Sequence, residues 1–110
     1  MKDILQKLKE TGVLRVTGSF ADGTNNENSD IDFKVKEDKP DTKYSERNIL
    51  KVIKVLQEFK IKFNSINSGI ISTIGENQDI EYELEFSDLF KPRKNKLPIV
   101  NIYGINFKTY

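Results

Sequence analysis

Two stretches of the chain have apolar residues at helical spacing. In residues 2–11 the apolar positions lie three and four apart and Gly12 follows, which is typical of a helix that ends at glycine. The stronger pattern lies within residues 44–60, where the apolar stripe is wide. The expected core residues of these two helices are Ile4, Leu5, Leu8, Ile49, Leu50, Val52, Ile53, Leu56 and Phe59.

The other apolar segments are shorter and predict strands. In residues 80–86, Ile80, Tyr82, Leu84 and Phe86 alternate with three glutamates, which indicates one core face and one polar face. Strands are predicted at residues 13–17, 30–36, 61–66, 69–74 and 80–86, with a closing hairpin at 99–110. This order predicts an α+β domain with a mixed sheet and two main helices on one face.

Composition narrows the function classes. The chain has 110 residues, enough for one modest core, so residues 1–110 are expected to form a single domain. Its residues are 36% hydrophobic and 32% charged, with a net charge of +1, so any binding of nucleic acid must depend on local charge. The apolar runs are too short to span a membrane and the first residues do not resemble a signal peptide, so a cytoplasmic protein is expected.

The sequence contains neither cysteine nor histidine. Disulfides, thiol nucleophiles, zinc-thiolate sites and the serine triad are therefore excluded. Any catalysis must use carboxylates, hydroxyls, lysine, arginine or a bound metal.

Two carboxylates interrupt an apolar strand pattern in the segment "DIDFKVK", which starts at Asp30. Asp30 and Asp32 are two residues apart, so their side chains point to the same face of the predicted strand. A hard divalent cation such as Mg²⁺ would relieve their repulsion. Upstream, Gly18 allows a tight turn, and Ser19 is predicted to be the N-cap of a helix start suited to phosphate, with Asp22 completing a capping box.

This stretch resembles the polymerase-beta-like nucleotidyltransferases, particularly their minimal prokaryotic members. The segment "GSFADGTNNENSDIDFKV" fits the family pattern of Gly-Ser, ten residues, then Asp-x-Asp. The resemblance implies that Gly18 and Ser19 hold the phosphates of a nucleotide such as ATP, while Asp30 and Asp32 bind Mg²⁺ or Mn²⁺ and act in catalysis.

The resemblance also implies a third carboxylate on a strand beside the first two. Three glutamates share one face of residues 80–86. Glu83 is favoured, because "YELEFSDLF" resembles the strand of the family that carries this acid; Glu81 is the runner-up, and Glu85 remains open. The strands at 30–36 and 80–86 are therefore expected to be neighbours, with the Gly-Ser turn over the same face.

The implied function is metal-dependent transfer of a nucleoside monophosphate to an acceptor hydroxyl of a protein, an RNA or a small molecule. A second hypothesis is an antitoxin-like partner of a helical toxin protein. A third is a catalytically silent nucleotide-binding remnant, because Asp22 replaces the basic residue of many members. The loop predicted at residues 91–98, "KPRKNKLP", carries a cluster of basic residues: Lys91, Arg93, Lys94 and Lys96. This basic cluster could contact phosphate or a nucleic-acid acceptor, or it could contact only solvent.

Overall fold

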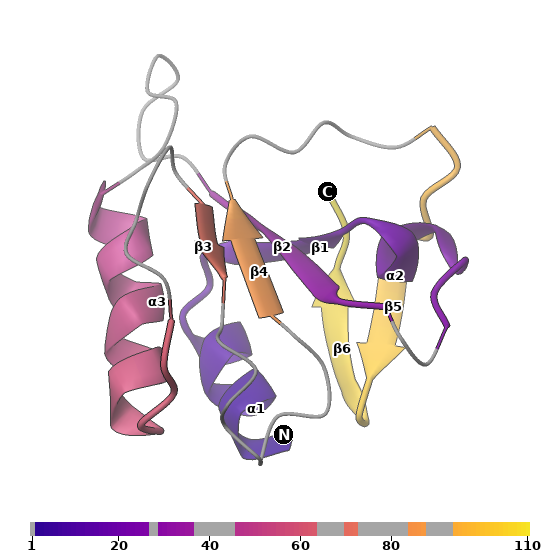
Figure 1. Cartoon of the computed structure of the whole chain (residues 1–110). Helices are drawn as coiled ribbons and strands as arrows, with labels where there is room; N and C mark the ends of the chain where they lie inside the picture. Colours follow the sequence, from indigo (N-terminus) through magenta and orange to yellow (C-terminus); the bar gives the residue numbers. More distant parts are fainter. Residues whose placement is uncertain (1, 27–28, 37–45, 64–69, 73–83, 88–93) are drawn as a thin grey trace.

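Within the described residues, the helices and strands follow one another in the order that the sequence patterns predict, except at the start of the strand predicted at 61–66 (Figure 1). The structure is a computed structural model, and it describes residues 2–26, 29–36, 46–63, 70–72, 84–87 and 94–110. The helices are α1 (Lys2–Glu10), α2 (Ser19–Asp22) and α3 (Glu46–Glu58). The strands are β1 (Leu14–Thr17), β2 (Ile31–Val35), β3 (Ile70–Ser72), β4 (Leu84–Ser87), β5 (Ile99–Ile102) and β6 (Ile105–Lys108).

Four of these strands form a mixed sheet in the order β1-β2-β4-β3. β2 pairs antiparallel with β1 and parallel with β4, while β3 pairs antiparallel with β4. β5 and β6 form a separate hairpin, whose continuation meets β1 through a parallel bridge between Val16 and Thr109. The mixed sheet and the predicted contact between the segments at 30–36 and 80–86 are thus confirmed.

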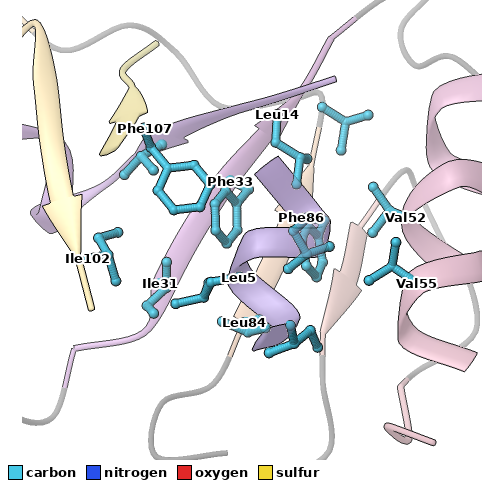
Figure 2. Close-up of a cluster of buried hydrophobic side chains, with 14 of the residues drawn as sticks. Leu5, Leu14, Ile31, Phe33, Val52, Val55, Leu84, Phe86, Ile102 and Phe107 are labelled. Atoms are coloured by element: carbon cyan, nitrogen blue, oxygen red, sulfur yellow. The ribbon is translucent and has the colours of Figure 1, made fainter. Parts of the chain in front are cut away.

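The core forms on the face of β2 that carries Ile31, Phe33 and Val35, all fully buried. Phe33 stacks on Phe86 of β4 with ring centroids 5.3 Å apart, and meets Phe107 of β6 edge-on at 5.5 Å. Figure 2 shows side chains from α1, α3 and the hairpin converging on this aromatic group. The two main helices and the hairpin therefore share one hydrophobic core with the sheet.

The prediction that Leu50 is a core residue is wrong, because its side chain is 62% exposed. It lies about 160° around the helix from the buried Val52, since an α-helix advances 3.6 residues per turn. Asn48 is buried instead, and its side-chain amide donates a hydrogen bond of 2.5 Å to the Lys36 carbonyl. The buried stripe of α3 is therefore narrower than the apolar residues of this helix suggested. The hydrogen bond of Asn48 joins α3 to the residue that follows β2.

The predicted strand at 61–66 is wrong at its start, where residues 61 and 62 lie in no strand. Lys60 has a positive φ of 56°, and the Ile61 amide donates back to the Leu56 carbonyl at 2.9 Å. This closure is typical of a helix C-terminus that turns the chain back. Ile61 is thereby buried as part of the α3 terminus, and residues 64–66 lie outside the described part of the chain.

No helix within the described residues combines the length and the apolar character that crossing a membrane requires.

The packing around β2 predicts a difference between two identical substitutions. Ile31→Val removes a methylene from a fully buried position and should lower the free energy of unfolding by about 1 kcal/mol. Ile99→Val, at a position that is 56% exposed, should change it by less than about 0.5 kcal/mol. Urea unfolding of both variants measures the difference. Equal losses would contradict the assignment of the core to this face of β2.

Candidate functional site

The turn between β1 and α2 is built on Gly18. Gly18 is the N-cap of α2, with φ 71° and ψ −153°, and its carbonyl accepts a hydrogen bond from the Ala21 amide at 3.0 Å. Only glycine adopts this backbone conformation without strain. The prediction that Ser19 is the N-cap is therefore wrong, because the cap needs the glycine and Ser19 becomes the first helical residue.

The capping box predicted for Asp22 also fails, since the cap residue has no side chain. The Asp22 carboxylate instead accepts hydrogen bonds from the Thr24 amide at 3.1 Å and from the Thr24 hydroxyl at 2.5 Å. Gly23, with φ 79°, ends the helix between them. Asp22 thus stabilises the turn that leaves α2.

The structure places the Asp32 side chain directly against the Gly18 turn. A Cβ atom at Gly18 would clash with Asp32 Oδ2 and would lie 3.2 Å from both Cβ and Cγ of Asp32. The register explains this contact, because Thr17, the residue before Gly18, pairs with Asp32 across β1 and β2. The Gly-Ser turn and the second aspartate are therefore brought together, and the absence of a side chain at residue 18 provides the space.

The two aspartates lie on the face of the sheet opposite the core. Asp30 and Asp32 are both half-buried, whereas Ile31 between them is fully buried. Half-burial leaves each carboxylate within reach of solvent, and the alternation keeps both on the same side. The paired acids that the sequence predicts are therefore accessible to a cation or a substrate.

Sequence reasoning missed the environment of Lys34, which follows Asp32 on the same face of β2. Lys34 is only 5% exposed, and its ammonium lies 5.3 Å from the centroid of the Tyr110 ring. Lys96 approaches the same ring at 6.0 Å. These distances allow cation–π attraction at each ammonium. The signal in the sequence was a lysine at a strand position between two buried apolar residues.

Of the predicted basic cluster, Lys94 and Lys96 are described and exposed, and Lys91 and Arg93 lie outside the described residues. Lys96 therefore brings one cation of this cluster to the face of β2 that carries Lys34, through their shared neighbour Tyr110.

The register between β2 and β4 determines which glutamate stands beside Asp32. Asp32 pairs with Glu85, between the buried pairs Ile31 with Leu84 and Phe33 with Phe86. Position 85 is thus the register partner of Asp32.

The two glutamates that the sequence ranked higher, Glu83 and Glu81, lie outside the described residues. Among the side chains that the structure describes, no group of three acidic, histidine or cysteine residues forms a metal cluster. At this site the described carboxylates are those of Asp30 and Asp32.

The model of a protein family described as "Nucleotidyltransferase domain" matches residues 1–94. The matched range includes the Gly18 turn, both aspartates and β4, and it ends before the β5–β6 hairpin. No curated protein and no solved structure gives a significant match.

The contact between Gly18 and Asp32 predicts unequal effects of alanine at two glycines that both have positive φ. Gly12→Ala should lower the free energy of unfolding by about 1 kcal/mol, which is the cost of a positive φ at alanine. The loss should be no larger, because the added Cβ would meet only open space. Gly18→Ala should cost about 3 kcal/mol, since it adds a clash with Asp32 to a conformation restricted to glycine.

Urea unfolding measures both losses, and the amide shift of Asp32 in an NMR spectrum reports whether this residue moves. Gly12→Ala is the matched control and should leave that shift unchanged. Similar losses in the two variants would show that Asp32 does not pack against the turn.

Proposed function

The chain belongs to the nucleotidyltransferase domain family, and on this premise we propose that it transfers a nucleoside monophosphate from a triphosphate such as ATP to an acceptor hydroxyl, releasing pyrophosphate. The observation that supports this most directly is the contact of the Asp32 carboxylate with the Gly18 turn. A phosphate held at that turn would lie beside a carboxylate that can share a cation with it.

We propose that Asp30 and Asp32 hold Mg²⁺ or Mn²⁺, with a glutamate of the neighbouring strand as third ligand. The donor set fits such a cation, because hard divalent ions take carboxylate oxygens and complete their shells with water and substrate phosphates. Both aspartates reach solvent on one face, which leaves room for a substrate. The bound cations would supply charge neutralisation at the phosphates and a lowered pKa for the acceptor hydroxyl.

The register of β4 favours Glu85 over Glu83 and Glu81 as the third ligand. Glu85 pairs with Asp32 at the centre of the sheet, where buried neighbours on both strands hold the alignment. The preference for Glu83 depended on a sequence resemblance, which does not determine the register between strands.

The residues of the chain then have separate roles. The backbone at Gly18 and Ser19 would bind the phosphates, and Asp32 would orient the acceptor and accept its proton, because the chain has no histidine to serve as a base. Lys34 and Lys96 would add positive charge on the same face of β2, where Tyr110 lies beside both. This arrangement favours a triphosphate over an uncharged substrate.

The binding of metal should be visible in thermal stability. Mg²⁺ at about ten times its dissociation constant should stabilise the wild type by about 1.4 kcal/mol and raise the Tm by roughly 5 °C. ATP should raise the Tm further only when Mg²⁺ is present. Asp32→Asn should abolish both responses, because it removes a central ligand and no core contact. Differential scanning fluorimetry measures all three.

Asp3→Asn is the matched control, since Asp3 is an exposed aspartate in the first turn of α1 and should leave both responses intact. A wild type without any metal-dependent shift would favour the silent remnant. Binding of metal and ATP without transfer to any acceptor, together with a stable complex with a helical neighbour protein, would favour the antitoxin-like alternative.

The assignment of the third ligand can be tested by three glutamine substitutions. We expect Glu85→Gln to weaken the affinity for Mg²⁺ at least tenfold, measured by titration of the Tm against metal concentration. Glu83→Gln and Glu81→Gln are matched controls on the same segment and should change the affinity less than threefold. The largest loss at Glu83 or Glu81 would restore the ranking that the sequence favoured.

A further inference from the structure

A hollow opens beside β1, at the other end of the strand from the Gly18 turn. Near Val16 the segment after β6 stays close to β1, through the bridge to Thr109 and a hydrogen bond of 2.8 Å from the Tyr110 amide to the Val16 carbonyl. Toward the start of β1, a hollow of about 260 Å³ lies among α1, β1 and the hairpin. Its main lining residues are Lys9, Leu14, Arg15, Ile99, Phe107 and Lys108.

The rim of this hollow is positively charged. Lys9 comes from α1, Arg15 from β1 and Lys108 from β6, and none of the described residues that line the hollow is acidic. Within the described part of the chain, none of these three cations forms an ion pair. Three like charges around one opening repel each other, and an anion would relieve that repulsion.

The hollow also contains part of the outer edge of β1. The Lys36 amide donates to the Val13 carbonyl at 2.7 Å, and the alternation of the antiparallel ladder then turns the peptide groups of Leu14 away from β2. The Leu14 carbonyl accepts a hydrogen bond from Arg15 Nη1 at 3.3 Å. The Leu14 amide lies on the same edge, which faces away from β2. An edge of the sheet thus lies within a cationic rim.

We propose that this hollow is a docking groove for an extended acidic segment of a partner protein. The segment would pair with the backbone of β1 at Leu14, as strands do when they add to the edge of a sheet. Its Asp or Glu side chains would lie near Lys9, Arg15 and Lys108, and an aliphatic side chain would cover Ile99, which is 56% exposed.

The groove and the candidate site lie at opposite ends of the same short strand, β1. Arg15 lies two residues from Thr17, the register partner of Asp32, a separation of about 7 Å along the strand. The binding inferred here does not depend on nucleotidyl transfer, because its residues are distinct from those proposed to bind metal and phosphate.

The test uses a fluorescein-labelled ten-residue peptide in which Glu alternates with Thr around a central Leu. We expect it to bind the full chain at low salt, and we expect the same peptide with Gln in place of Glu to bind at least tenfold more weakly, by fluorescence polarisation. Lys9→Glu combined with Lys108→Glu should weaken the binding of the Glu peptide at least tenfold. The peptide should also shift the Leu14 amide in an NMR spectrum and slow its hydrogen exchange.

The matched control is Lys51→Glu combined with Lys54→Glu, which changes the net charge equally at exposed positions of α3 and should leave binding within twofold. If the charge reversal at the groove lowers the Tm, Lys9→Gln combined with Lys108→Gln replaces it. Equal binding of the Glu and Gln peptides, or equal losses in the groove and control variants, would overturn the proposal. So would binding of a labelled oligouridine, but not of the peptide, that depends on Lys9 and Lys108, because the groove would then recognise nucleic acid.

Discussion

The register of β2 within the sheet is the constraint on which both the core and the candidate site depend. β2 is paired on both sides, with β1 and with β4. Its alternate residues divide between the aromatic core around Phe33 and the polar face that carries Asp32. A slip of one residue would exchange the two faces, burying charges and exposing a phenylalanine. The packing that stabilises the fold therefore also holds the carboxylates in place.

A second constraint is steric, at Gly18. Its backbone, with φ 71° and ψ −153°, lies in a region that is essentially restricted to glycine. The approach of the Asp32 side chain adds a second, independent restriction, because any Cβ at residue 18 would overlap the carboxylate. The glycine of the Gly-Ser pair is thus required for the position of a side chain on another strand, as well as for the shape of its own turn.

The net charge of +1 hides a separation of charge within the molecule. The aspartates lie at the start of β2, near the Gly18 turn, whereas Lys9, Arg15 and Lys108 surround the far end of β1. Lys34 and Lys96 lie beside Tyr110. A cation and an anionic partner would therefore be attracted to different parts of the chain, which would allow a triphosphate site and a docking groove to operate separately.

The sequence by itself determined the order of most helices and strands, the core residues of α1, and the two aspartates that share one face of β2, because periodicity and turn residues are local properties of the chain. The motif from Gly18 to Asp32 likewise identified the family from residues close together in sequence. Only the tertiary structure decided that Glu85 pairs with Asp32, that Leu50 faces solvent, and that Lys34 is buried beside Tyr110. These features depend on register, helix rotation and contacts between distant segments, and no local pattern determines them.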